Sequence, residues 1–227
     1  MDMNLLVFQE PRGVMRILHL IFSICAFATI SGYTGTIYYT CYQQTAADKF
    51  GYPFLIALER NFVNQSGIIA NANSSTANSQ PSENIVCPIQ VVGDFSSDAK
   101  FFVTTGVLAM LYSLAIIYVY TKLDNMYKSN SKLPLYDFLI TVIFGVLWLS
   151  SSAAWANGLT GLKSATNPSL KPQVCKNCTA ISSSFSTLNI SVIFGFLNFF
   201  LWAADLWFIY KETSWFQGNQ MQSTEGI

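Results

Sequence analysis

Four long apolar runs constrain the fold of this 227-residue chain more than any other feature. They cover residues 17–38, 101–121, 136–156 and 189–210. Each run is close to the ~20 residues that a helix needs to cross the hydrocarbon of a bilayer. Because every backbone N–H and C=O must be paired within the segment there, runs of this length form helices. We therefore expect an all-α membrane protein with four transmembrane helices.

The composition supports this interpretation. Hydrophobic residues make up 52% of the chain and charged residues only 11%, whereas soluble domains average ~25% charged residues. The net charge is zero, so no overall field points to nucleic acid.

Arg12 and Arg16 precede the first apolar run as in a signal peptide, but the run is too long for an h-region. We expect it to be retained as a span.

The distribution of positive charge predicts the orientation. An even number of spans places both termini on one side, and the positive-inside bias acts on short segments beside helix ends. Lys and Arg are dense in such segments at Arg12, Arg16, Lys122, Lys128, Lys132 and Lys211. We expect cytosolic termini, lumenal loops at 39–100 and 157–188, one membrane domain at 1–216 and a short cytosolic tail at 217–227.

Both predicted lumenal loops carry acceptor triplets for N-glycosylation. Asn64, Asn73 and Asn177 each begin an Asn-x-Ser/Thr triplet, and such sites are used on the lumenal side. Triplets of this kind also arise by chance in Asn- and Ser-rich sequence. Their agreement with the charge distribution is what makes them informative.

Cysteine usage indicates an oxidising compartment on the same side. Cys41 and Cys87 lie in the first loop and Cys175 and Cys178 in the second, whereas Cys25 lies within the first span. Four cysteines allow three pairings. We favour Cys41–Cys87 and Cys175–Cys178, because each pair closes within its own loop. The CxxC spacing also fits a redox or zinc motif, but a second CxxC and a lumenal histidine are missing, so we expect a structural disulfide.

The loops differ in their expected order. Residues 64–84 are rich in Asn, Ser and Ala and bury too little apolar surface to repay ordering entropy. Residues 89–92 predict a short strand before a Gly93-Asp94 turn. Pro168 and Pro172 exclude a continuous helix through the second loop.

Small and polar residues form a stripe on the fourth apolar run. At spacings of three and four, the stripe consists of Ser191, Gly195, Asn198, Trp202 and Asp205. Small and polar residues let helices approach closely in lipid. The stripe is therefore either a partner-binding face, a pore lining, or ordinary packing between helices of this chain.

One acidic residue, Asp205, lies well inside a predicted span, and ionisable groups there are functional candidates. His19 lies at similar depth in the first run. A His19–Asp205 hydrogen bond would lower the cost of burying both side chains and could sense protons. The alternative is a shallow carboxylate that reaches interfacial water.

Several motifs in the chain resemble those of the synaptophysin family. The third run contains WLSSSAAWA at 148–156 followed by Gly158-Leu159, and the fourth contains LNISVIFGFLN at 188–198. VGDFSS at 92–97, Leu111-Tyr112-Ser113, Tyr52-Pro53-Phe54 and the KETSW run at 211–215 add to the match. The resemblance covers nearly the whole chain. It implies a four-helix protein of the MARVEL type, similar to synaptophysin and synaptoporin.

The resemblance also implies a function. It predicts a non-enzymatic protein of synaptic or other secretory vesicle membranes without a cofactor, which contacts cholesterol and forms a homo-oligomer. The implied partners are a synaptobrevin-type SNARE and the membrane sector of the V-type ATPase, which the chain would organise during trafficking and exocytosis. The family has lumenal disulfides and a glycosylated first lumenal loop.

Two other classes of function fit the sequence less well. A channel or transporter built from an oligomer needs polar residues through the full bilayer depth, and only the fourth run offers a polar stripe. A membrane enzyme needs a catalytic constellation. The single histidine excludes multi-His metal boxes, and neither a GxSxG motif nor paired carboxylates inside the spans are present.

Overall fold

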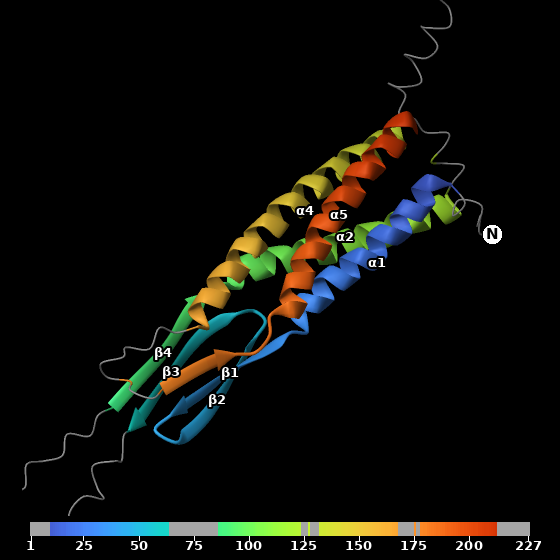
Figure 1. The fold of residues 1–227 in the computed structure, drawn as a ribbon. Coiled ribbons are helices and arrows are strands. Elements are labelled where there is room, and N and C mark those ends of the chain that lie inside the picture. Colours follow the sequence, from blue (N-terminus) through green and yellow to red (C-terminus); the bar gives the residue numbers. More distant parts are fainter. Residues whose placement is uncertain are drawn as a thin grey trace, which may run out of the picture.

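The computed structural model describes residues 10–63, 86–123, 127, 132–167, 175 and 178–212. In this part of the chain four long helices lie side by side, and two small sheets extend from one end of them (Figure 1). The predicted tail at 217–227 and the Asn-rich stretch at 64–84 lie outside the described residues.

The four predicted spans are confirmed as helices. They are α1 (Pro11–Ser31), α2 (Ser96–Lys122), α4 (Lys132–Ala165) and α5 (Ser186–Glu212). All four are long and apolar enough to cross a membrane. The chain is therefore a mostly helical membrane protein with four candidate spans.

The helices form a closed bundle. α1 packs against α2 and α5, and α4 packs against the same two helices, so each helix has two neighbours. α1 begins and α5 ends at one end of the bundle, which we call the terminal end (Figure 1). The opposite end, from which the strands extend, we call the strand end.

The bundle separates a tightly packed inside from an apolar outside. Large rings fill the inside, where Trp148, Trp155 and Trp202 are fully buried. On the outside Ile193 and Phe200 of α5 are 64% and 63% exposed. Such large exposed apolar side chains suit contact with lipid rather than with water.

α1 ends seven residues before the predicted boundary at 38, because the following residues form a strand. Gly32 caps the helix at its C-terminus, and β1 covers Thr34–Cys41. Ile37, Tyr39 and Cys41 are buried at every second position, which is the alternation of a half-buried strand. The run is apolar enough for a helix, but its β-branched and aromatic residues suit the sheet.

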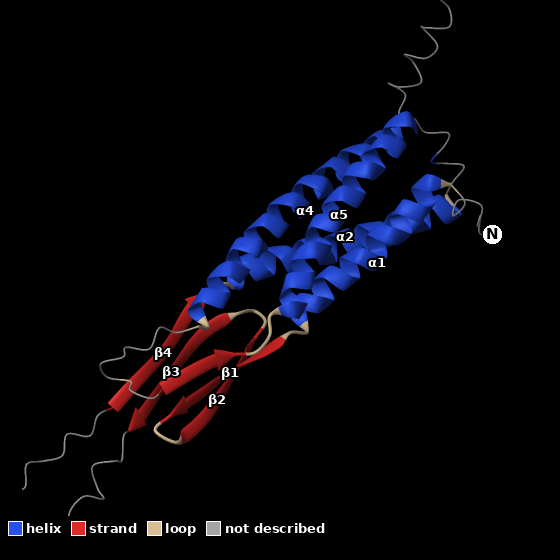
Figure 2. Ribbon diagram, viewed as in Figure 1, coloured by secondary structure: helices blue, strands red, loops and turns tan. Residues whose placement is uncertain are grey.

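The strands form two small antiparallel sheets (Figure 2). The first has the order β2-β1-β5 and contains β1, β2 (Gln44–Gly51) and β5 (Cys178–Ser182). The second pairs β3 (Leu55–Val63) with β4 (Val86–Asp94). The predicted short strand at 89–92 lies within β4, but the other strands were not expected. Most of the described loop sequence is thus β-structure and not irregular.

The second loop also begins later than predicted. α4 continues past 156 to Ala165 and packs beside β4. One side of this extra length lies against protein, where Gly158, Leu159 and Leu162 are buried. The predicted break at Pro168 and Pro172 falls outside the described residues.

Candidate functional site

A buried arginine links three helices near the terminal end of the bundle. Arg16 of α1 is fully buried, and its Nη2 donates to Asp137 Oδ1 of α4 at 2.6 Å and to Thr141 Oγ1 at 3.0 Å. Its Nη1 lies 3.1 Å from Asp205 Oδ2 of α5. One guanidinium therefore faces two buried carboxylates from two neighbouring helices, so hydrogen bonds must stabilise the second negative charge. We call Arg16, Asp137 and Asp205 the charge cluster.

Tyrosine hydroxyls complete the surroundings of Asp137. Tyr112 and Tyr120, both on α2, donate to Oδ1 and Oδ2 respectively. Tyr127, in the connection between α2 and α4, donates to Oδ2 at 3.2 Å. All four helices thus contribute a side chain to one polar site within the bundle.

The guanidinium lies over the faces of two aromatic rings. The Cζ atom of Arg16 lies 5.5 Å from the ring centroids of both Tyr112 and Trp202. Arg is more weakly hydrated than Lys and stacks on aromatic faces. The residue is therefore suited to a buried position that excludes water.

Ion pairing and hydrogen bonds together stabilise the buried charges of the charge cluster. Moving an ion out of water costs several kcal/mol. Good pairing geometry together with additional hydrogen bonds is needed to offset this cost. Here the hydrogen bonds to Asp137 supply that additional compensation. The cluster joins α1, α4 and α5, and removing Arg16 would leave two buried carboxylates without their cation.

The predicted His19–Asp205 hydrogen bond is not formed. The closest atoms, His19 Nδ1 and Asp205 Oδ2, are 3.8 Å apart, which is too long for a hydrogen bond. The same oxygen faces Arg16, which lies three residues before His19 on α1. His19 instead stacks on Trp202, with ring centroids 4.1 Å apart. The shallow, water-exposed alternative is also wrong, because the Asp205 side chain is fully buried.

The predicted partner-binding stripe of α5 lies inside the chain's own bundle. Ser191, Asn198, Trp202 and Asp205 are fully buried, and Gly195 is buried with them. A partner cannot reach this face without displacing a helix of the same chain. The structure therefore matches the packing alternative for these five residues.

Individual contacts explain why the stripe needs small and polar residues. Trp155 Nε1 of α4 donates to Ser191 Oγ at 2.9 Å, and Asn198 Nδ2 donates to the Phe22 carbonyl of α1 at 3.1 Å. A Cβ at Gly195 would lie 2.3 Å from Ser152 Oγ of α4 and 2.6 Å from the Phe102 ring of α2, so a larger residue there would displace both side chains. The stripe holds α5 against both of its neighbours.

At the strand end, the disulfides join the two loops instead of closing within each. Cys41 is bonded to Cys178, and Cys87 to Cys175. The predicted Cys41–Cys87 and Cys175–Cys178 pairs are thus wrong. The reason is strand pairing: β1 and β5 are neighbours, and Cys41 and Cys178 are partners in their register.

The cysteines do not form a metal site. The sulfur atoms of Cys41, Cys87 and Cys178 lie within 4.8 Å of one another, but each belongs to a disulfide. Metal binding needs thiolates, which a disulfide does not provide. The predicted glycosylation sites Asn64, Asn73 and Asn177 lie outside the described residues and stay predictions.

Sequence reasoning missed Arg16, Asp137 and the three tyrosines as parts of one site. Arg16 was counted only as a flanking positive charge. A signal was nevertheless present, since Arg16, His19 and Ser23 are spaced by three and four residues on α1. All three are fully buried, which makes a second polar stripe that faces the one on α5.

The fold and this site define a class of protein. Four apolar helices closed around a polar cluster, with a disulfide-linked β-extension at one end, describe an integral membrane domain. The sequence matches the model of the membrane-associating MARVEL domain over residues 8–208. The chain belongs to the MARVEL family. This is a family of membrane-associating domains and not of enzymes.

Proposed function

We propose that the chain is a non-enzymatic organiser of synaptic or secretory vesicle membranes, from the synaptophysin and synaptoporin branch of the MARVEL family. The observation that carries this proposal is the family match over residues 8–208 together with the synaptophysin-like motifs. Several residues of those motifs occupy packing positions: Trp148, Trp155 and Asn198 are all fully buried in the bundle. These buried residues therefore maintain the shared fold, and contact with partners falls to the exposed surfaces.

The disulfides support a lumenal position for the strand end. Disulfides persist in oxidising compartments, and both pairs lie in the β-extension. The density of Lys and Arg near the terminal end supports cytosolic termini. In a vesicle membrane the strand end then faces the lumen.

The partners contact the outer surface of α5. This helix carries three exposed aromatic side chains, Phe200, Trp207 and Phe208, at 63%, 57% and 37% exposure. Aromatic residues are enriched at protein interfaces and among their hot spots. The partners are a synaptobrevin-type SNARE and the membrane sector of the V-type ATPase, which present helices in the same bilayer. Lipids, including cholesterol, cover the remaining outer surface, and homo-oligomers form through the same outer helix faces.

The test is purification of the full chain from native vesicles in mild detergent, followed by mass spectrometry of the proteins recovered with it. The Phe200→Ala/Trp207→Ala variant should lose synaptobrevin and pump subunits at least about tenfold, since two hot-spot residues at ≥ 2 kcal/mol each exceed that factor. The matched control is Ile143→Ala/Val146→Ala on the outer face of α4, where both residues are exposed. This control should retain the partners.

Two results would contradict the proposal. One is equal loss of the partners from both variants. The other is recovery of the chain alone as a symmetric oligomer, which would favour the channel alternative and call for conductance measurements in bilayers.

A further inference from the structure

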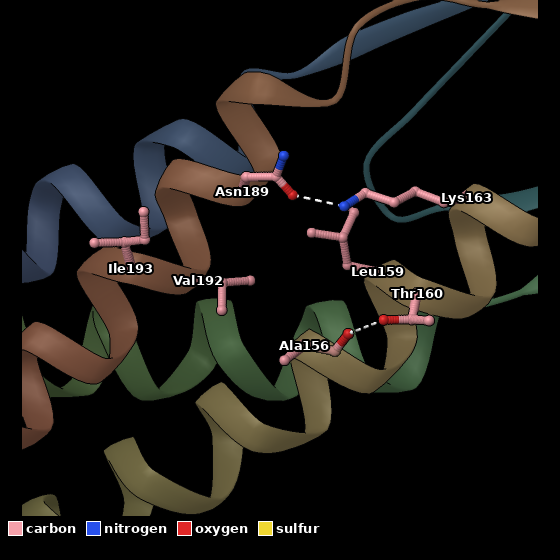
Figure 3. Close-up of a pocket in the computed structure, with 7 residues that line it drawn as sticks. All are labelled: Ala156, Leu159, Thr160, Lys163, Asn189, Val192 and Ile193. Atoms are coloured by element: carbon pink, nitrogen blue, oxygen red, sulfur yellow. Dashed lines mark hydrogen bonds between the residues drawn. The ribbon is translucent and has the colours of Figure 1, made fainter.

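An open groove lies between α4 and α5 at the strand end of the bundle. Figure 3 shows that its side chains come from facing turns of the two helices, with Lys163 and Asn189 at the upper rim. The lining consists of Ala156, Leu159, Thr160, Lys163, Asn189, Val192 and Ile193. The charge cluster is not part of it.

The rim of the groove carries a positive charge with a neutral partner. Lys163 Nζ donates to Asn189 Oδ1 at 2.6 Å, which uses one of the three donors of the ammonium group. Among the described residues Lys163 takes part in no ion pair, and no acidic residue lines the groove. The Asn189 amide adds two N–H donors at the same rim. The rim is thus complementary to an anion.

The rest of the groove is apolar. Ala156, Val192 and Ile193 line it away from the rim, and Ile193 is 64% exposed. Ala156 lies seven residues before Lys163 on α4, which is about 10 Å along the helix axis. The groove therefore changes from cationic to apolar over about two helical turns.

From the length of the helix, we expect this change in polarity to fall at the edge of the membrane. The 34 residues of α4 span about 51 Å, well beyond the ~30 Å of hydrocarbon. Asn189 is in the first turn of α5, which begins at Ser186, so the bonded Lys163 lies at the same level. A lysine there can keep its ammonium group at the polar boundary and its stem against apolar surface.

We propose that the groove binds one glycerophospholipid, with its phosphate on Lys163 and Asn189 and an acyl chain along Ala156, Val192 and Ile193. The uncompensated ammonium distinguishes this occupant from a sterol. A sterol hydroxyl can accept a hydrogen bond from the ammonium group but has no charge to pair with it, whereas a phosphate is an anion and forms an ion pair with it. This inference does not depend on the proposed function.

The test uses the purified, delipidated full chain with three probes: dioleoylphosphatidylglycerol, dioleoylglycerol, which has the same acyl chains without the phosphate, and cholesterol. Native mass spectrometry counts the lipids retained per chain. We expect one phosphatidylglycerol, at least about fivefold less dioleoylglycerol, and a roughly tenfold loss of phosphatidylglycerol in Lys163→Gln, the factor that corresponds to one charged hydrogen bond.

Three variants serve as controls. Lys163→Arg should retain the phospholipid, because it keeps the charge. Lys211→Gln should also retain it, because Lys211 lies near Trp207 at the terminal end. Ile193→Trp should lower retention by filling the apolar part without altering the charge. Wild-type retention by Lys163→Gln, or equal binding of dioleoylglycerol or cholesterol, would overturn the proposal.

Discussion

Arg16 joins α1 to α4 and α5 through two buried ion pairs. Its guanidinium faces Asp137 and Asp205, and all three side chains are at most 1% exposed. Breaking a buried ion pair by removing one partner typically costs about 3–5 kcal/mol, because the remaining charge stays buried. The tyrosine hydroxyls that donate to Asp137 also stabilise its buried charge. Substitutions of Tyr by Phe remove one hydrogen bond at a time and measure each contribution.

Tyr120→Phe tests the contribution of a single hydroxyl. The substitution removes a hydrogen bond to the Asp137 carboxylate and keeps the ring, so we expect a loss of about 1–3 kcal/mol in the free energy of unfolding. Tyr118→Phe is the matched control, because Tyr118 lies on the same helix and is 60% exposed. Denaturant unfolding in detergent measures both, and equal stability of the two variants would contradict a structural role for the hydroxyl of Tyr120.

At this scale the sequence predicts which residues are unusual but not how they pair. Asp205 and His19, which the sequence predicts to lie at similar depth, approach each other to 3.8 Å. Arg16 was assigned to the flank of the span, because a long side chain near a helix end normally reaches the polar boundary. The rotation of α1 that points Arg16 into the bundle is decided by packing of the whole bundle, and no local pattern encodes it.

At the scale of elements, the β-extension is held together by bonds between the two loops. β1 pairs with β2 on one side and with β5 on the other. Tyr42 and Gln43 connect β1 to β2 and have φ values of 50° and 67°, as a tight hairpin turn requires. The Cys41–Cys178 and Cys87–Cys175 disulfides then join segments from before α2 and after α4.

Thiol labelling of a Cys41→Ser variant tests this connectivity. The substitution should free Cys178 and leave Cys87 and Cys175 bonded. After denaturation without reductant, alkylation and peptide mapping should identify Cys25 in the wild type and Cys25 with Cys178 in the variant. Labelling of Cys87 instead would show that the first loop closes on itself.

An ion pair between β2 and β3 makes the β-extension sensitive to acid. Arg60 donates to the Asp48 carboxylate from two nitrogen atoms, and these hydrogen bonds lower the pKa of Asp48. Because the pKa is lowered, the ion pair stabilises the folded state fully at pH values above the unfolded-state pKa of Asp48, about 4. This stabilisation is lost as the pH falls through the pKa of Asp48 in the folded state. Because Arg60 is 47% exposed, the effect is small.

We therefore expect Asp48→Asn to melt below the wild type at pH 7 and to approach it below about pH 4. Glu59→Gln, next to Arg60 on β3, is the control and should follow the wild type at each pH. Melting temperatures of the full chain in detergent measure the difference. A constant gap between Asp48→Asn and wild type from pH 7 to pH 3 would contradict the role of the Asp48 charge.

The helices were predictable and most of the strands were not, for a physical reason. Spanning helices need long apolar runs that are visible locally, and all four were found. The start of β1 could not be separated from the first apolar run, because Ile37, Tyr38 and Tyr39 continue its hydrophobicity. The pairing of β1 with β5 joins segments 137 residues apart, and such contacts leave no periodic signal in either segment.

At the scale of the whole molecule, the polar helix faces pack inside the bundle and the apolar helix faces form its outer surface. The polar stripes of α1 and α5 face inward and hold the bundle together. The outer faces carry large apolar side chains, among them Leu111, Val146 and Phe200, and are the surfaces available to other membrane components. A MARVEL domain built in this way can meet partners laterally without exposing its charge cluster to lipid.

Site-specific photo-crosslinking in native vesicles tests most directly whether partners contact the outer face of α5. A benzophenone amino acid is placed at position 200 or at position 202. Phe200 and Trp202 are two residues apart on α5, yet Phe200 is 63% exposed and Trp202 is fully buried. We predict adducts with other vesicle membrane proteins from position 200 and none from position 202. Adducts from position 202 with none from position 200 would show that the inner face meets the partner and would contradict the account.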